Sequence, residues 1–329
     1  MGEELFGLGF LGDESWKGER MMEAKYDRET TRGILRKVRQ LEIRTNRLVD
    51  DALAGQYHSV FKGKGMDFDE VRAYTPGDEL RTIDWNVTAR SGEPFVKRFR
   101  EERELTVLLV IDISGSGDFG SGVLSKRELA AEVGSMLAFS ALKNNDKVGL
   151  VLFSEDVELY IPPGKGRRHV LRIVREILFY EPEGRRTDFE VPLDFVNRVQ
   201  PKRAVTFLIS DFCLMGEFHA ALAGLRPKLV IGGRRHDLVA VAVADPRDTE
   251  LPDVGLLTVE DAETGEQVEL NTGSATLREA FRALGEERKA VLEKEFRRAR
   301  VDLLEISTDE PYMPVLSGFF SKREKRRAG

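Results

Sequence analysis

The pattern of apolar and polar positions changes from residue 101 onwards into short apolar runs separated by longer amphipathic stretches. The runs at Leu105–Asp112, Lys147–Phe153 and Arg203–Ser210 are nearly continuous, which is typical of strands buried on both faces of a sheet. Ser125–Leu142 places its apolar side chains on one helical face. Strands and helices that alternate at these lengths predict a doubly wound α/β fold, with a mostly parallel sheet covered by helices on both faces.

Further elements follow from the same periodicity. Val157–Ile161 is short enough to be an antiparallel partner of the strand before it. Residues 250–273 break the rhythm, because a turn at Asp261–Glu266 joins two alternating runs and predicts an inserted hairpin. The remaining predicted elements are helices near Arg167–Tyr180, Phe189–Val199, Glu217–Leu225 and Ala275–Arg300, and strands at Asp237–Ala244 and Val301–Ile306.

The first hundred residues have a different texture. Residues from about Asp27 to Ala54 carry an apolar stripe at helical spacing and stop at Gly55, as helices often do. From Tyr57 to Arg100, short extended pieces are broken by Gly and Pro. The predicted parts are a flexible arm at 1–25, a helix with a small α+β domain at 26–100, the α/β domain at 101–320, and a basic, solvated tail at 321–329.

Acidic and basic side chains are mixed at high density between Tyr57 and Arg100. Mixed signs at this density favour local ion pairs over an anion-binding patch. If the segment contacts a partner, the side chains that we expect to do so are Arg72, Arg81 and Arg90. Trp85 is interpreted as a packing anchor, and the segment lacks the interleaved aromatic residues of a nucleic-acid platform.

Composition narrows the functional classes. A charged fraction of 33% and a net charge of −6 over 329 residues describe a globular protein with no general attraction to nucleic acid. The single cysteine, Cys213, excludes an internal disulfide and a cysteine-rich zinc site, and we expect it to be a buried apolar side chain. Because no apolar stretch approaches the roughly 20 residues that cross a bilayer, we predict a cytoplasmic protein without membrane insertion.

Candidate metal ligands gather where the predicted strands end. Asp112 closes the first apolar run, and the hydroxyls of Ser114 and Ser116 follow at alternate positions. Thr187 precedes a predicted helix, and Asp211 directly follows another core strand. Open parallel sheets bind ligands beyond the carboxyl ends of their strands, so these five side chains are expected to converge. Oxygen donors suit Mg²⁺ or Mn²⁺, and few protein charges leave such an ion able to accept a carboxylate from outside.

Other chemistries fit this loop less well. Each acid by itself is as readily explained as a helix cap. A Gly-x-Gly-x-x-Gly pattern at 115–120 matches the dinucleotide fingerprint, but the surrounding oxygens would repel a pyrophosphate, so no nucleotide is expected. The four histidines show no triad arrangement, and only Asp118 or Asp188 is available as a base. An enzyme is therefore not predicted.

The five candidate ligands together resemble the metal-ion-dependent adhesion site of von Willebrand factor A domains, with all five positions of that pattern present. Upstream, the block Gly65–Asp78 (GMDFDEVRAYTPGD) and its continuation to Lys97 resemble the bacterial domain-of-unknown-function family numbered fifty-eight. Members of that family carry this block ahead of an A-type domain. The resemblance covers roughly residues 50–320.

This resemblance implies a MoxR-type AAA+ ATPase as partner, with a chaperone-like role in the assembly or maturation of a client protein. We therefore predict a cytoplasmic, non-enzymatic adaptor that binds partners through Mg²⁺ or Mn²⁺. Two alternatives stay open. One is a hydrolase that uses the same ion to activate water. The other is a scaffold whose 57–100 segment makes the contacts while the metal site is purely structural.

Overall fold

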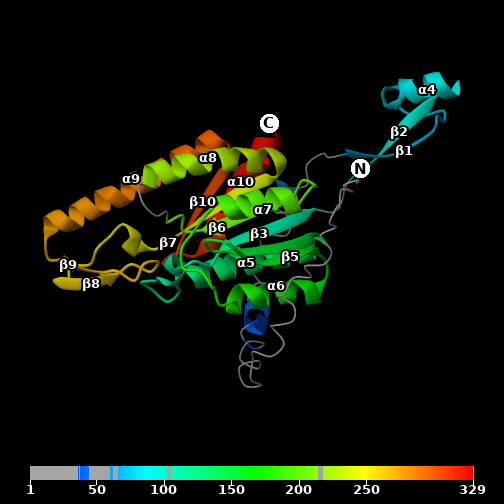
Figure 1. The fold of residues 1–329 in the computed structure, drawn as a ribbon. Coiled ribbons are helices and arrows are strands. Elements are labelled where there is room, and N and C mark those ends of the chain that lie inside the picture. Colours follow the sequence, from blue (N-terminus) through cyan, green and yellow to red (C-terminus); the bar gives the residue numbers. More distant parts are fainter. Residues whose placement is uncertain are drawn as a thin grey trace, which may run out of the picture.

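The computed structural model describes residues 36, 38–43, 60–61, 66–101, 105–213 and 218–328. Its centre is a six-stranded sheet in the order β10-β7-β6-β3-β4-β5. All neighbouring strands are parallel except β4 and β5, which confirms the predicted α/β class and the antiparallel pair. The strands are β3 (Thr106–Asp112), β4 (Lys147–Phe153), β5 (Val157–Gly164), β6 (Val205–Ser210), β7 (Asp237–Ala244) and β10 (Asp302–Ser307) (Figure 1).

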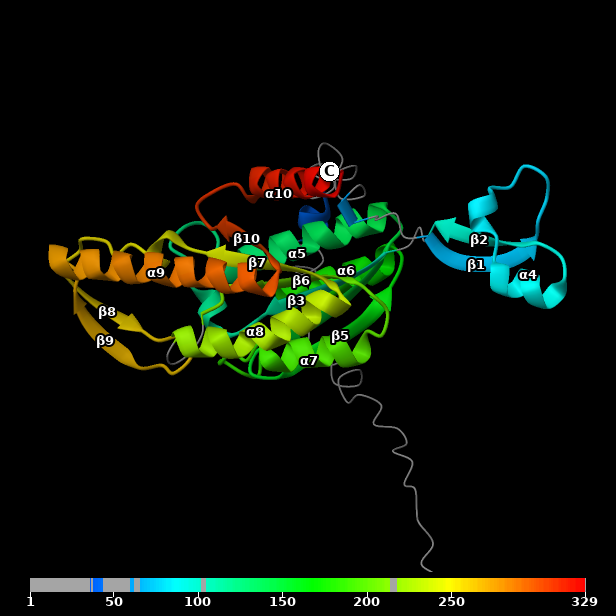
Figure 2. The ribbon, with the colours of Figure 1, turned by 90° about the horizontal axis from the view of Figure 1, so that it is seen from above.

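Helices cover both faces of this sheet, as the sequence pattern predicted (Figure 2). One face carries α5 (Lys126–Lys143), α6 (Arg167–Phe179) and α10 (Tyr312–Ala328), and the other carries α7 (Glu190–Val199), α8 (Phe218–Arg235) and α9 (Ala275–Ala299). Along β3, Val107 and Leu109 enter the first core cluster, while Leu108 and Val110 enter the second. Because both faces are buried, the strand has to be apolar at successive positions.

Helix α8 is longer than predicted, since it continues to Arg235 instead of ending near Leu225. The prediction was wrong because Pro227 lies within the helix, and proline usually ends one. Pro227 is exposed, and so is Ala223, whose carbonyl loses its helical hydrogen-bond partner. Water can solvate that carbonyl, so the helix tolerates the proline.

The described part of the predicted N-terminal helix packs into the main core. Arg36 and Val38–Ile43 are helical, and Val38 and Leu41 belong to the core cluster on the α5 face. Glu42 accepts hydrogen bonds from the Arg167 guanidinium of α6 at 2.8 and 3.0 Å. The sequence-based division placed this helix together with the small mixed domain in one part, residues 26–100, whereas Val38 and Leu41 belong to the α/β core. The predicted arm at 1–25 lies outside the described residues.

A small α+β unit, residues 66–101, precedes the sheet. β1 (Met66–Ala73) and β2 (Phe95–Glu101) form an antiparallel pair, connected through α4 (Trp85–Ser91). This β1–β2 unit stands at the end of the molecule where β3 begins (Figures 1 and 2). Trp85 is 70% exposed, so its interpretation as a packing anchor was wrong. As the first residue of α4, it lies on the outside of a short helix with no buried residue.

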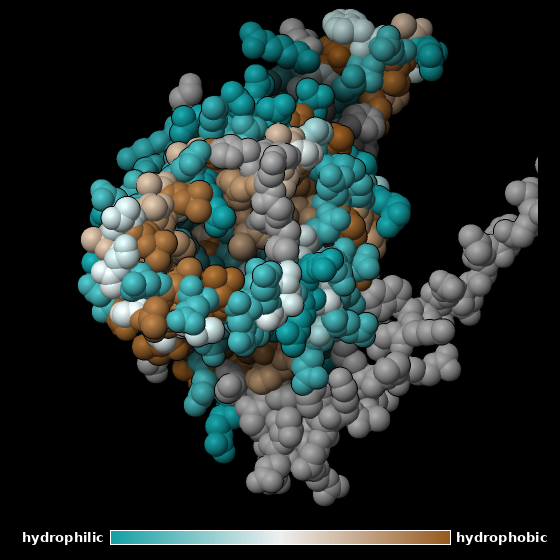
Figure 3. Space-filling view, turned by 60° about the vertical axis from the view of Figure 1, so that its left-hand side comes forward, coloured by the Kyte–Doolittle hydropathy of each residue, from teal (hydrophilic) through white to brown (hydrophobic). Residues whose placement is uncertain are grey.

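An inserted hairpin stands at the opposite end of the molecule. β8 (Leu256–Glu260) and β9 (Gln267–Asn271) pair antiparallel within the predicted insertion. The hairpin follows β7 and precedes α9, so it belongs to the carboxyl ends of the parallel strands (Figure 1). Figure 3 views the molecule from this side and shows apolar side chains beside polar ones, and Leu256 and Val268 are among the exposed apolar residues.

The basic C-terminal segment is exposed at Lys322 and at Glu324–Arg326, as predicted for a solvated tail, but it is helical and it buries Arg323. Helix α10 continues through it to Ala328. Arg323 is 9% exposed, forms ion pairs with Asp237 and Asp302, and lies over the Phe61 ring. Its charge is thus part of the structure at the amino ends of β7 and β10. Across the ranges that the structure describes, no helix is both long and apolar enough to cross a membrane.

Candidate metal centre

Asp112 is held at the carboxyl end of β3 by its neighbours. Its Oδ1 accepts a hydrogen bond from the Ser114 backbone N–H at 2.9 Å, and its Oδ2 accepts one from the Ser210 hydroxyl at 2.6 Å. The second bond follows from the parallel register, which pairs Ile111 with Ile209 and so brings the next residues together. The side chain is buried, with 8% of the residue exposed.

The loop after β3 presents two hydroxyls beside this carboxylate. The Ser114 and Ser116 hydroxyl oxygens lie 3.2 Å apart, and both residues are buried. The Arg127 guanidinium, on α5, donates to the carbonyl oxygens of Ile113 and Ser114 at 2.8 and 3.1 Å. These bonds fix the loop backbone, so the hydroxyls keep their place beside Asp112.

Asp211 is presented by an unusual turn at the end of β6. Phe212 has a φ of 51°, a left-handed conformation that is costly for a bulky residue. Its buried ring compensates, since it stacks on Phe189 at 5.3 Å and meets Phe296 edge-on at 5.1 Å. Cys213, the next residue, is exposed, although burial raises the pKa of its thiol to about 12, so the expectation of a buried apolar cysteine is met only in part.

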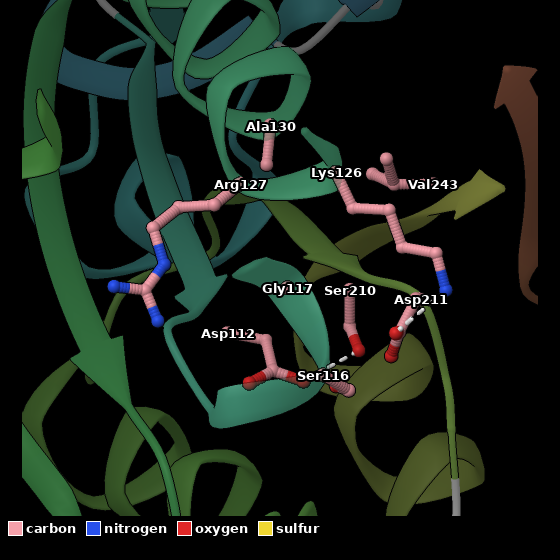
Figure 4. Close-up of a pocket in the computed structure, with 9 residues that line it drawn as sticks. All are labelled: Asp112, Ser116, Gly117, Lys126, Arg127, Ala130, Ser210, Asp211 and Val243. Carbon is pink, nitrogen blue, oxygen red and sulfur yellow. Dashed lines mark hydrogen bonds and ion pairs between the residues drawn. The ribbon is translucent and has the colours of Figure 1, made fainter. Parts of the chain in front are cut away.

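Lys126 brings a positive charge to the site that the sequence interpretation missed. Its Nζ lies 3.2 Å from Asp211 Oδ2 and 2.7 Å from Asp248 Oδ1, and the lysine is 6% exposed (Figure 4). Burial alone would lower the pKa of Lys126, but the Asp211 and Asp248 carboxylates outweigh it and raise the pKa. The lysine is therefore charged at neutral pH and compensates Asp211.

Thr187 lies in a loop that packs against the Asp112 loop. The Gly115 backbone N–H donates to the Arg185 carbonyl at 2.9 Å, which joins the two loops. The Thr187 hydroxyl donates to Glu263 Oε1 at 3.2 Å. Glu263 belongs to the turn of the β8–β9 hairpin and is 9% exposed, so the inserted hairpin reaches the site. Sequence reasoning had identified this turn but assigned it no role at the site.

The negative charges of two acids at this site, Asp112 and Glu263, are not fully compensated by neighbouring positive charges or hydrogen bonds. Burial and the nearby Asp211 charge raise the pKa of Asp112 to about 6, although hydrogen bonds from Ser210 and Ser114 oppose the shift. Burial raises the pKa of Glu263 to about 7, with Asp112, Asp261 and Asp211 adding repulsion. Among the described residues, Glu263 Oε2 is a buried oxygen without a hydrogen-bond partner. A cation would compensate the charges of Asp112 and Glu263 and would give Glu263 Oε2 a partner, so the donor set fits a divalent ion.

The space at the site is small. A cavity of about 10 Å³ is lined by Asp112, Ser116, Ser210, Asp211 and Lys126, among others (Figure 4). That volume is comparable to a single water-sized sphere. The described residues contain no group of three or more His, Cys, Asp or Glu side chains placed to hold a metal. An ion here would therefore depend on hydroxyl oxygens as well as on carboxylates.

The five predicted ligands are brought together unequally. Asp112, Ser116 and Asp211 line the cavity, and Ser114 joins them through its contact with Ser116. Thr187 does not line the cavity, and neither does Glu263, which accepts a hydrogen bond from the Thr187 hydroxyl. Sequence reasoning missed three residues here: Lys126, Ser210 and Glu263. Ser210 was detectable because it immediately precedes Asp211 at a strand end, whereas no sequence signal identified Lys126 or Glu263.

The two acids considered as catalytic bases, Asp118 and Asp188, interact with other groups of the protein. Asp118 pairs with Arg127 at 3.0 Å and is largely exposed. Asp188 accepts a hydrogen bond from the Glu190 backbone N–H at 2.8 Å, at the start of α7. The glycine pattern at 115–120 falls in a short 3-10 helix (Gly115–Asp118), separated from α5. It therefore does not present a long helix N-terminus to a phosphate.

The candidate partner-binding arginines belong to the β1–β2 unit, away from the metal centre (Figure 1). The Arg72 guanidinium donates to both carboxylate oxygens of Asp78, at 2.8 and 2.7 Å. This bidentate pair holds the pKa of Asp78 well below its usual range. Arg81 and Arg90 are exposed. Local pairing thus accounts for Arg72, as the mixed charges indicated.

Comparison with known proteins identifies a family. The family model described as "Protein of unknown function DUF58" matches residues 70–291. The uncharacterized protein Rv1480 of Mycobacterium tuberculosis is 32% identical over 290 residues, which cover 88% of this chain and 89% of that protein. The match spans both the β1–β2 unit and most of the α/β domain.

Solved structures give looser likenesses. The conserved hypothetical protein BatB from Bacteroides thetaiotaomicron has a TM-score of 0.42 and 17% identity, covering 67% of this chain and 99% of that chain. The SpRpn10 VWA domain has a TM-score of 0.37 and 11% identity, covering 65% of this chain and 94% of that domain. Superpositions this loose do not by themselves assign a function.

Proposed function

The chain belongs to the DUF58 family of proteins of unknown function, and from that premise we propose that it is a protein-interaction adaptor whose divalent ion captures an acidic side chain. The observation that carries this proposal is the convergence of Asp112, Ser114, Ser116 and Asp211 beyond the carboxyl ends of β3 and β6. The resemblance of these residues and Thr187 to a metal-ion-dependent adhesion site supports it.

The residues that would hold the ion are the five oxygen donors Asp112, Ser114, Ser116, Thr187 and Asp211. A bound Mg²⁺ or Mn²⁺ would supply a coordination position for a carboxylate from a partner. Ser210 and the Ser114 backbone N–H orient Asp112, as outer partners of metal ligands do. Lys126 offsets the charge of Asp211, so the protein neutralises such an ion incompletely. An acidic partner group would complete the compensation.

The partners that we propose are a MoxR-type AAA+ ATPase and a client protein that the adaptor connects to it, in the cytoplasm. The resemblance of the upstream block and the adhesion-site pattern supports this assignment. A non-enzymatic role is favoured over a hydrolase because Asp118 and Asp188, the acids considered as bases, are engaged with Arg127 and the start of α7. A water activated at this site would need a proton acceptor, and Glu263 is the acid that could serve, so the hydrolase is kept as the alternative.

The test is a pull-down from native-host lysate with six samples: tagged wild type, Asp112→Ala and Asp118→Ala, each with Mg²⁺ and with chelator. Asp118→Ala is the matched control, since it removes an exposed acid from the same loop. We expect a AAA+ ATPase or its client to be retained by the wild type and Asp118→Ala in Mg²⁺ alone. Equal recovery from all samples would refute metal-dependent capture.

The scaffold alternative keeps one supporting observation, the exposure of Trp85, Arg81 and Arg90 on the β1–β2 unit. An exposed tryptophan beside arginines is the composition that dominates protein interfaces. Trp85→Ala and Arg81→Glu test it in the same pull-down. If these variants lose the partner and wild-type recovery of the partner does not depend on Mg²⁺, the interface lies on this unit.

A further inference from the structure

Glu263 has an environment that a surface hairpin turn does not need. Turns usually point their charged side chains into water, yet this glutamate is 9% exposed. Its Oε1 accepts the Thr187 hydroxyl, and its Oε2 is buried without a partner among the described residues. Burying a carboxylate in this way is costly unless a positive charge compensates it.

The turn is built to hold Glu263 in that position. Asp261 Oδ1 accepts hydrogen bonds from the backbone N–H groups of Glu263 and Thr264, at 2.9 and 2.8 Å. Gly265 closes the turn with a φ of 74°, and its N–H donates to the Asp261 carbonyl at 2.7 Å. A turn fixed by three hydrogen bonds directs its buried glutamate with little freedom.

The hairpin is also seated directly on the loop after β3. A Cβ placed on Gly115 would lie 2.6 Å from the Ala262 carbonyl oxygen and 3.3 Å from that of Arg185. Three segments therefore meet at one residue that has no side chain: the Asp112 loop, the Thr187 loop and the hairpin turn. Glycine at this position permits the approach that brings Glu263 to Thr187.

From this geometry we propose that Glu263 is an internal ligand of the metal site, delivered by the β8–β9 hairpin. This inference rests on the proposed function. Glu263 does not line the cavity as it stands, so its unpartnered carboxylate oxygen would turn to the bound ion and take the coordination position of an acidic partner group, which closes the site in the absence of a partner. A partner binds by displacing Glu263, and the hairpin then leaves the loop.

The inference predicts two measurable properties of Glu263→Gln, a variant of nearly the same shape. Its affinity for Mn²⁺, measured by electron paramagnetic resonance, falls by about tenfold or more, as expected when a coordinating carboxylate is lost. In the wild type, Mn²⁺ slows amide hydrogen exchange in the 256–271 hairpin, and in Glu263→Gln it does not. Glu266→Gln, which changes an exposed acid in the same turn, should match the wild type in both measurements.

The outcomes separate the two proposals. The internal-ligand inference would be overturned if Glu263→Gln bound Mn²⁺ with wild-type affinity, or if Mn²⁺ did not change amide hydrogen exchange in the wild-type hairpin. If Asp112→Ala abolishes Mn²⁺ binding in the same experiment, the metal site itself survives that result. Absence of Mn²⁺ binding by the wild type, or equal binding by Asp112→Ala, would instead refute the proposed function. Circular dichroism of each variant confirms that it is folded.

Discussion

The β1–β2 unit and the β8–β9 hairpin differ in which end of the sheet they occupy. The β1–β2 unit precedes β3 and stands at the amino ends of the parallel strands, whereas the β8–β9 hairpin follows β7 and reaches the carboxyl ends. Ligand sites of open α/β sheets lie at the carboxyl ends. Consequently the insertion without a distinctive motif reaches the candidate site, and the motif-rich unit does not.

The difference shows that sequence distinctiveness and proximity to chemistry are separate properties. The block at 65–97 is the clearest mark of the family, yet its polar residues serve local structure, as Arg72 and Asp78 do. Glu263 lies in an ordinary turn, but packing of that turn at Gly115 brings it to Thr187, one of the predicted ligands. The comparison can be tested by making matched changes in each region.

The largest contrast should come from aromatic residues. Phe212→Ala removes a ring packed between Phe189 and Phe296, and we expect it to lower the free energy of unfolding by about 3–5 kcal/mol. Trp85→Ala removes an exposed ring and should change it by less than about 0.5 kcal/mol. Urea unfolding monitored by circular dichroism measures both. A loss for Trp85→Ala as large as for Phe212→Ala would mean that Trp85 is a packing anchor after all.

Glycine substitutions give a smaller contrast with a second readout. Gly115→Ala forces the loop after β3 away from the Ala262 carbonyl. It should lower the free energy of unfolding by about 1–3 kcal/mol and speed hydrogen exchange in the β8–β9 hairpin. A Cβ at Gly77 would meet no atom within 4 Å, but the residue has a φ of 113°. Gly77→Ala should therefore lower the free energy of unfolding by about 1 kcal/mol and leave hydrogen exchange in the β8–β9 hairpin unchanged. Equal exchange in both variants would show that the hairpin is not seated at Gly115.

The response to pH should have opposite signs in the two regions. In chelator, the raised pKa values of Asp112, about 6, and Glu263, about 7, mean that the folded protein binds protons more tightly than the unfolded chain. Stability should therefore fall as pH rises from about 4 to about 7, by on the order of 1 kcal/mol or more. Glu263→Gln should flatten this slope.

In the β1–β2 unit the pKa of Asp78 is lowered by Arg72, so their bond stabilises the unit above the usual aspartate pKa and is lost as pH falls below about 4. Hydrogen exchange of residues 66–101, expressed as protection factors that correct for the intrinsic pH dependence of amide exchange, measures this directly. Protection factors that do not fall as the pH is lowered from about 5 to about 2 would contradict the prediction.

Much of the architecture was predictable because hydrophobic periodicity reports burial. The runs that became β3, β4 and β6 are apolar at successive positions because both faces are covered, and strand polarity then placed Asp112 and Asp211 at one edge. Whether the five predicted donors bind a metal stays a prediction.

What could not be predicted depends on long-range placement. The contacts of Glu263 and Lys126 depend on how far a hairpin folds back and where a helix begins, which local pattern does not report. Inference from residue type also failed at Trp85, because tryptophan is usually buried and this side chain is 70% exposed. Its position on α4, a short helix with no buried residue, determines that exposure.

The most direct test of the metal-dependent account is an anomalous diffraction map from crystals of the wild-type protein grown with Mn²⁺. The account predicts one manganese peak among Asp112, Ser114, Ser116, Thr187 and Asp211, with Glu263 turned to the ion. A map without a peak there, with Lys126 still paired to Asp211, would contradict it.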